Sequence, residues 1–265
     1  MLQVLNRGAH AVAWQPGVRP VLFSSSLAQS GPDTAWRGGI PICAPWFGAG
    51  LTGDLRPSHG PARISEWECT RRTDTATEHR LEVARDAAGK PAKLELVSRI
   101  QAEDAQLRSE LTITNRGGDM ATVEAALHSY FAVSDVTAIE LRGLAGSAYV
   151  DKVADGRRMS PEPAIEFGAL VDRVYDAPRQ PIEIVDAAWS RTLRIDLGDA
   201  TQAVVWNCGP EAAPGDMGEG EWRGYVCVES AVLAEHARSL APGQSLLLSS
   251  SVAEVPAVQG DLGRH

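Results

Sequence analysis

The dominant pattern of this chain is the alternation of apolar and polar side chains, which predicts β-strands. In segments 93–100 and 191–197 every second side chain is apolar, so one face of each would meet a core and the other water. Similar short segments follow one another along most of the chain, a spacing typical of sandwiches and barrels. We predict strands at 18–25, 64–72, 78–86, 93–102, 106–115, 121–134, 138–144, 181–186, 191–197, 202–207, 224–230 and 245–254.

The connections between these segments favour antiparallel pairing. Gly- and Pro-containing turns follow the strands at 86–91, 115–119 and 241–244. The one helical segment that the pattern indicates is short, near 233–240. Parallel sheets need crossover connections that are usually helical, so we expect an all-β fold of antiparallel strands.

Length and composition fit one large β-domain. The chain has 265 residues, of which 44% are hydrophobic and 22% are charged, enough apolar material for a sizeable core. We expect a single domain over 1–265, with 258–265 as a frayed tail.

Charge and motifs exclude several classes of function. The net charge is −9 and no basic stripe occurs, so we expect no nucleic-acid partner, although local arginines can still hold a small anion. No signal peptide and no apolar run of membrane-spanning length is seen, which predicts a cytoplasmic protein without a membrane partner. No nucleotide-binding, zinc-protease or C-x-x-C motif occurs, so we expect neither a cofactor nor a metal.

Two Gly/Pro-rich stretches, 30–61 and 209–221, are long for connections between strands, and such loops are often functional. Segment 37–48, Arg-Gly-Gly-Ile-Pro-Ile-Cys-Ala-Pro-Trp-Phe-Gly, suits a rigid loop that approaches a ligand closely, and 59–63, His-Gly-Pro-Ala-Arg, has a similar composition. By composition alone, both segments could equally be ordinary structural turns.

Two polar side chains interrupt strongly apolar strands. His128 lies within 123–133, and Glu229 lies within 224–233. A lone histidine in such a strand can be a hydrogen-bonded core residue, whereas a buried carboxylate needs a partner or a ligand. Both side chains are therefore candidates for one cleft.

Seven motifs in order along the chain resemble those of the glucose-6-phosphate 1-epimerases, the hexose-6-phosphate branch of the aldose 1-epimerase superfamily. They cover nearly the whole chain, from about residue 8 to 254. They are 37–48, 59–63, Leu-His-Ser-Tyr-Phe-Ala-Val-Ser-Asp at 127–135, Tyr-Val-Asp-Lys at 149–152, Val-Asp-Arg-Val-Tyr at 171–175, Val-Val-Trp-Asn at 204–207 and Tyr-Val-Cys-Val-Glu-Ser at 225–230.

The resemblance implies a galactose-mutarotase-like antiparallel β-supersandwich whose concave face holds a sugar. It implies that His128 is the general acid and Glu229 the general base. The expected reaction interconverts the α and β anomers of hexose 6-phosphates, glucose 6-phosphate first, by opening and reclosing the ring. Removing a proton from the O1 hydroxyl while protonating the ring oxygen needs one acid and one base, and no metal or redox group.

For the substrate, the resemblance implies that Arg37 and Arg63 bind the phosphate and that His59 and Asp172 contact sugar hydroxyls. Arginine suits this task because its planar fork can bond two phosphate oxygens at once. The alternative is a purely structural role, in which both arginines pair with acids such as Asp33, Asp54 or Glu66 and hold the loops.

The sequence departs from the family pattern at Ala44 and Pro61, both in the expected ligand loops. Substrate preference is therefore less firmly implied than reaction type. The alternatives are a non-catalytic carbohydrate-binding sandwich and a mutarotase for neutral aldoses. The expected partner is a small-molecule sugar phosphate, and a monomer is expected.

Overall fold

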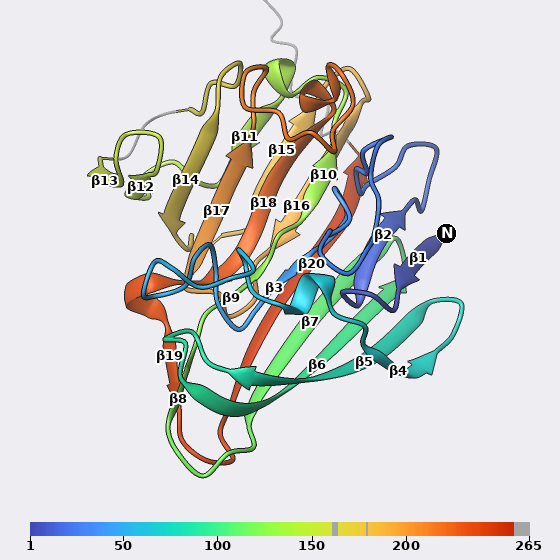
Figure 1. The fold of residues 1–265 in the computed structure, drawn as a ribbon. Coiled ribbons are helices and arrows are strands. Elements are labelled where there is room, and N and C mark those ends of the chain that lie inside the picture. The colour runs from blue at the N-terminus through green and yellow to red at the C-terminus, as the bar shows by residue number, and fades with distance from the viewer. Residues whose placement is uncertain (161–163, 179, 257–265) are drawn as a thin grey trace, which may run out of the picture.

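Two large antiparallel sheets dominate the computed structural model, which describes residues 1–160, 164–178 and 180–256 (Figure 1). The first sheet has the order β13 (Arg157–Met159), β12 (Tyr149–Asp151), β14 (Val171–Asp176), β17 (Gln202–Asn207), β18 (Tyr225–Val232), β9 (Ala125–Leu127) and β3 (Ile42–Cys43), with β10 (Tyr130–Ala132) also paired to β18. The second has the order β11 (Glu140–Arg142), β15 (Ile182–Asp186), β16 (Arg191–Asp196), β20 (Ser245–Pro256), β7 (Gln106–Asn115), β6 (Pro91–Glu103), β5 (Ala76–Arg85) and β4 (Glu68–Arg72).

Two small sheets and four 3₁₀ turns complete the described structure. The small sheets pair β1 (Leu2–Leu5) with β2 (His10–Trp14), and β8 (Ala121–Val123) with β19 (Arg238–Leu240). The turns are η1 (Ala62–Ile64), η2 (Val136–Ala138), η3 (Glu221–Gly224) and η4 (Ala234–His236). The prediction of an all-β antiparallel fold is confirmed, and no helix in the described residues is long and apolar enough to cross a membrane.

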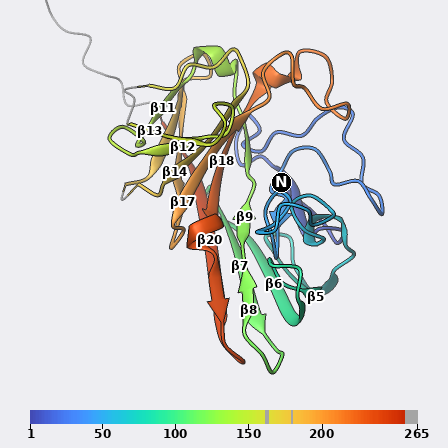
Figure 2. The same ribbon diagram turned by 60° about the vertical axis from the view of Figure 1, so that its left-hand side comes forward.

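The core joins side chains from both large sheets. Leu94, Leu96 and Ile100 alternate along β6 and are buried in the same cluster as Val226 and Val228 of β18. Every residue of β18 is buried, because one face of this central strand meets the core and the other is covered by loops. Figure 2 shows the N-terminal segment, in blue, gathered on one side of β9 and β18.

Two predicted elements were wrong. Segment 18–25 forms only isolated bridges, at Leu22 and Ser24, instead of a strand. The hydroxyl of Ser24 donates to the carbonyl of Val12 and that of Ser25 to Glu221, and such local side-chain bonds compete with a regular ladder.

The helix predicted near 233–240 is also absent from the structure. Residues 234–236 form the turn η4 and residues 238–240 form β19, paired with β8. Ala234 has a φ of 52°, outside the helical region, and pairing with β8 satisfies the backbone that a helix would have bonded internally. The tail expected over 258–265 lies outside the described residues.

Candidate functional site

The register of the strands places His128 and Glu229 side by side on one face of the sheet. Leu127 of β9 lies opposite Ser230, and Tyr130 of β10 lies opposite Cys227. The register is the same on both sides of the two-residue interruption, so His128 stands opposite Glu229. Directly opposed residues on antiparallel strands share a face of the sheet, and His128 Nδ1 is 3.4 Å from Glu229 Oε1.

The same face continues across β17 and β14. Cys227 lies opposite Trp206, which lies opposite Asp172. The backbone N–H of Lys152, just beyond β12, donates to the carbonyl of Asp172. This face of the sheet therefore carries Glu229 on β18 and Asp172 on β14, with His128 and Lys152 just beyond the ends of β9 and β12.

Arg37 reaches this face of the sheet from a loop that runs against the backbone of two other segments. A Cβ at Gly38 would collide with the carbonyl of Phe23, and one at Gly39 with the carbonyl of Ala11. Both glycines have positive φ angles, of 117° and 63°. The Gly-Gly pair after Arg37 is thus required by close backbone approach rather than by mobility.

His59 and Arg63 come from the next loop and from η1. His59 has a φ of 64°, a backbone conformation that non-glycine residues seldom adopt and that often marks a functional position. Its Nδ1 accepts a long hydrogen bond of 3.4 Å from the N–H of Gly48, which leaves Nε2 as the protonated nitrogen of the neutral ring. Arg63 donates from Nη2 to the carbonyl of Ser58.

One cavity of about 370 Å³ collects these side chains, a volume in the range of small-molecule sites. All six residues expected at the site line it: Arg37, His59, Arg63, His128, Asp172 and Glu229. The wall also includes Phe47, Tyr130, Lys152 and Trp206.

The histidine and the carboxyl group at the floor of the cavity have unused polar atoms. His128 Nδ1 and both carboxyl oxygens of Glu229 are buried without a hydrogen-bond partner among the described residues. A buried polar atom without a partner is costly, so this pair is suited to receive the hydroxyls of a ligand.

Burial shifts the protonation of both groups toward their neutral forms. It lowers the pKa of His128 well below its ordinary value, and the neighbouring His59, Arg63 and Arg37 act in the same direction. Burial likewise raises the pKa of Glu229 well above its ordinary value, helped by the charge of Asp172 and opposed by Lys152 and Arg63. These shifts favour a protonated Glu229 beside a neutral His128 imidazole.

Three cationic side chains line the cavity around His59. Burial together with Arg63, Lys152 and Arg37 lowers the pKa of His59 to about 3, so its ring is neutral. Lys152 is exposed, and its Nζ lies 4.8 Å from the centre of the Phe47 ring. Arg37, Arg63 and Lys152 together form the cationic wall of the cavity.

Arg37 does not pair with the acids of its own loop. Its Nε donates to Asp216 at 3.0 Å and its Nη1 donates to the hydroxyl of Tyr130 at 3.0 Å. In the described residues neither Asp33 nor Asp54 pairs with Arg37 or Arg63, and Glu66 pairs with Arg7 instead.

Ala44 and Pro61, the two departures from the family pattern, do not line the cavity formed by the described residues. The carbonyl of Ala44 accepts the N–H of Ala62, and the carbonyl of Pro61 accepts that of Ile64. Both residues shape the loop behind His59 and Arg63.

Lys152 and Asp216 were not predicted as site residues. Lys152 is part of the motif Tyr-Val-Asp-Lys at 149–152, from which a role could have been predicted. Asp216 lies in the Gly/Pro-rich stretch 209–221, but its pairing with Arg37 spans 179 residues and leaves no local pattern.

Comparisons with known proteins agree with this architecture. A Salmonella typhimurium protein named "Putative glucose-6-phosphate 1-epimerase" is 33% identical over 234 residues, which cover 84% of this chain and 77% of that protein. The crystal structure of "a putative mutarotase" from Salmonella typhimurium superposes with a TM-score of 0.83 at 29% identity, covering 96% of this chain and 87% of that one.

A galactose mutarotase related enzyme from Lactobacillus acidophilus has the same fold, with a TM-score of 0.76 at 14% identity over 97% of this chain and 95% of its own. The expected galactose-mutarotase-like supersandwich is therefore confirmed. Residues 1–252 match the family described as aldose 1-epimerase, and the chain belongs to that family.

Proposed function

We propose that this protein interconverts the α and β anomers of hexose 6-phosphates, with glucose 6-phosphate as the leading substrate. Membership of the aldose 1-epimerase family makes it an epimerase that acts on sugars. The observation that carries the finer proposal is that Arg37, Arg63 and Lys152 line the same cavity as His128 and Glu229.

The distance between His128 and Glu229 suits a reaction at one carbon. The O1 hydroxyl and the ring oxygen of a pyranose are both bonded to C1, so groups acting on them have to stand close together. A separation of 3.4 Å meets this requirement. The catalytic pairs of glycosidases are two carboxyl groups at least about 5 Å apart, so this pair suits ring opening better than glycoside hydrolysis.

In the proposed ring opening, the Glu229 carboxylate takes the proton of the O1 hydroxyl while the His128 imidazolium donates a proton to the ring oxygen. The bond between C1 and the ring oxygen breaks, which gives an open-chain aldehyde. Rotation about C1–C2 exposes the other face of the carbonyl. In reclosure, protonated Glu229 returns its proton to O1 and neutral His128 removes the proton from the attacking hydroxyl.

This cycle needs one transferable proton shared by His128 and Glu229. The pKa shifts of the two groups support a pair that holds one proton. Burial favours the proton on Glu229 and a neutral His128, which is the state that recloses a ring in this mechanism. A bound sugar that donates its O1 hydroxyl to Glu229 favours the carboxylate, and the proton is then available to His128.

His59 and Asp172 are proposed to orient the sugar. A neutral His59 with its proton on Nε2 can donate to a hydroxyl, and the carboxyl group of Asp172 can accept from one. Arg37 and Arg63 are proposed to hold the 6-phosphate. The Nε of Arg63 is buried without a hydrogen-bond partner among the described residues, so this donor has no competing acceptor there.

The test measures anomer exchange by NMR on glucose 6-phosphate and on glucose. Arg37→Ala and Arg63→Ala each remove a charge-assisted contact worth about 1.5–3 kcal/mol, which predicts a loss of about 10- to 150-fold in kcat/KM for glucose 6-phosphate. Exchange of unphosphorylated glucose should scarcely change.

Arg56→Ala is the matched control, because Arg56 lies on the same loop, is exposed and does not line the cavity. It should leave both substrates unaffected. An equal loss of both substrates in the Arg37 and Arg63 variants would mean that the phosphate binds elsewhere. Detectable sugar binding without any catalysed exchange would favour a carbohydrate-binding module instead.

A further inference from the structure

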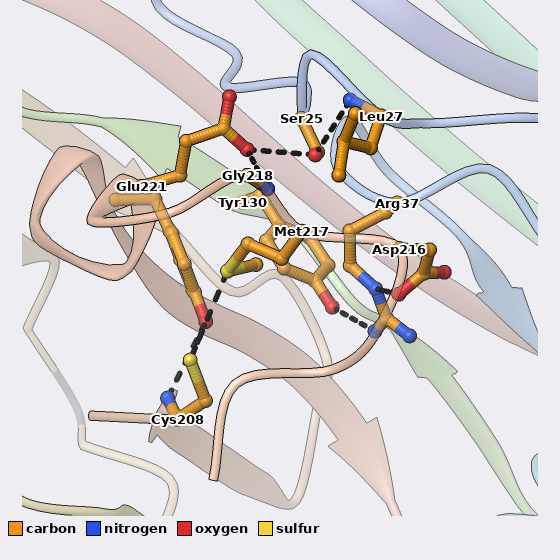
Figure 3. Close-up of polar contacts among 10 residues, drawn as sticks. Ser25, Leu27, Arg37, Tyr130, Cys208, Asp216, Met217, Gly218 and Glu221 are labelled. Atoms are coloured by element: carbon orange, nitrogen blue, oxygen red, sulfur yellow. Dashed lines mark hydrogen bonds and ion pairs between the residues drawn. The ribbon is translucent and has the colours of Figure 1, made fainter. Parts of the chain in front are cut away.

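Asp216 stands beside the cationic wall but on a different loop from either arginine. It belongs to the stretch 209–220 between β17 and η3, and its carboxylate accepts from Nε of Arg37 (Figure 3). The side chain of Asp216 is 27% exposed and that of Arg37 is 24% exposed, so the pair is partly shielded from water. Figure 3 shows the Arg37 guanidinium between Asp216 and the hydroxyl of Tyr130.

The loop that carries Asp216 is fixed at its end by Glu221. The Glu221 carboxylate accepts from the hydroxyl of Ser25 at 2.7 Å, from the N–H of Ser26 at 2.9 Å and from the N–H of Gly218 at 2.7 Å. Ser25 and Ser26 belong to the segment that leads to Arg37. Glu221 therefore holds the loop of Asp216 and the loop of Arg37 together.

The residue next to Asp216 is also held. Met217 is buried, and its sulfur lies 3.8 Å from the sulfur of Cys208, which in turn contacts the hydroxyl of Tyr225. Asp216 is thus followed directly by the packed Met217 and the anchored Gly218, which, with its bond to Arg37, gives its carboxylate a defined position.

The contacts of Arg37 leave part of its fork available. Among the described residues, Asp216 takes the Nε donor and Tyr130 takes one donor of Nη1, which is two of the five N–H groups of a guanidinium. Three N–H groups on the two terminal nitrogens are left for an anion in the cavity that Arg37 lines. A phosphate monoester, with three terminal oxygens, matches this remaining fork.

We propose that Asp216 is a positioning residue that fixes the Arg37 guanidinium for the phosphate of the substrate. This inference rests on the proposed function. Asp216 has two opposing effects on a phosphate: it orders the arginine, which favours binding, and it adds a negative charge nearby, which disfavours it. In this proposal the gain in phosphate binding from ordering Arg37 exceeds the loss from the negative charge of Asp216.

Two substitutions separate these effects. Asp216→Ala removes the acceptor, so a rotamer-rich side chain has to be ordered on binding, and KM for glucose 6-phosphate should rise about 2- to 12-fold with kcat nearly unchanged. Asp216→Asn keeps an oxygen that accepts from Nε and removes the charge, so its KM should equal or fall below that of the wild type. Glu219→Ala, an exposed acid on the same loop, is the control and should change neither constant.

A double variant tests whether Asp216 acts through Arg37. KM of Arg37→Ala/Asp216→Ala should equal or fall below that of Arg37→Ala alone, because the arginine that Asp216 orders is gone and the second change removes only the repulsion between its carboxylate and the phosphate. The inference is overturned if the two losses add, if Asp216→Ala leaves KM unchanged, or if Asp216→Asn is as impaired as Asp216→Ala. Wild-type protein and Arg37→Ala report separately on the proposed function: a wild type without preference for the phosphorylated sugar refutes both proposals, whereas retained preference with additive losses refutes only this one.

Discussion

Replacing Glu229 by glutamine should make the protein more stable and less active. The side chain is 1% exposed, and neither of its oxygens has a hydrogen-bond partner among the described residues. Glutamine keeps the size and shape of the side chain but cannot ionise. The substitution therefore removes the cost of burying an ionisable carboxyl group, which has to hold a proton or carry a buried charge, together with the proposed general base.

The size of the stability effect depends on pH, and its sign follows from proton binding. Burial raises the pKa of Glu229, so the folded protein keeps a proton that the unfolded chain releases above about pH 4.5. The free energy of unfolding contributed by this group is then greatest at low pH and falls as pH rises, by at most about 1.4 kcal/mol per pH unit. It stops falling once the folded carboxyl group ionises.

The difference in stability between Glu229→Gln and the wild type should therefore grow from about pH 5 upward. Each kcal/mol corresponds to about 2–4 °C in Tm for a chain of this size. Urea denaturation of both proteins across this pH range measures the difference directly. In the same preparations, NMR exchange with glucose 6-phosphate should show a loss of at least about 10²-fold in turnover.

Glu221→Gln is the matched control with the opposite sign. Although burial opposes ionisation, hydrogen bonds from Ser25, Ser26 and Gly218 lower the pKa of Glu221. That group stabilises the fold above its ordinary pKa and loses the effect as pH falls, so its glutamine variant should lose most stability at neutral pH. A stability difference for Glu229→Gln that does not change with pH, or a folded variant with near-wild-type turnover, would refute the reasoning.

Three further outcomes are expected. His128→Asn should fold, as shown by circular dichroism, and lose at least about 10²-fold in anomer exchange; near-normal turnover would remove His128 from the acid role. Dialysis against a strong chelator should leave turnover intact, since the described residues contain no cluster of three metal-ligating side chains, and a loss restored by one added divalent metal would contradict this. Gly60→Ala should lower the free energy of unfolding by at least about 1 kcal/mol in urea titrations, because the φ of Gly60 is 78° and a Cβ would collide with the Ala44 carbonyl. Gly118→Ala is the control, because a Cβ there meets open space, and it should not lower stability. Equal stabilities of the two variants would contradict the argument.

Strands with one buried face were predictable from the sequence, because alternation along β6 and β16 has a single cause, a core on one side. The segment 149–176 was missed, although it contains β12, β13 and β14. In this segment the face toward the cavity carries Asp172 and, just beyond β12, Lys152, so polar residues interrupt the apolar pattern. These polar residues made the strands harder to predict from the sequence.

The polar intrusions at His128 and Glu229 were visible in the sequence, and strand register explains why they meet. Their proposed roles, and those of the other site residues, come from family resemblance and stay predictions. The contact of Arg37 with Asp216 could not be read from the sequence, because it joins loops 179 residues apart and leaves no local pattern.

The His128–Glu229 pair and the residues proposed to bind the phosphate stand on different kinds of backbone. Glu229 belongs to β18 and His128 lies between β9 and β10 in the middle of a sheet, whereas Arg37 and Arg63 come from an N-terminal loop and the 3₁₀ turn η1. Sheet interiors resist change because each residue has packed neighbours on both sides, but loops accept insertions and substitutions. Exchange of these loops would therefore alter the residues proposed to bind the phosphate and leave the proposed acid–base pair of the sheet in place.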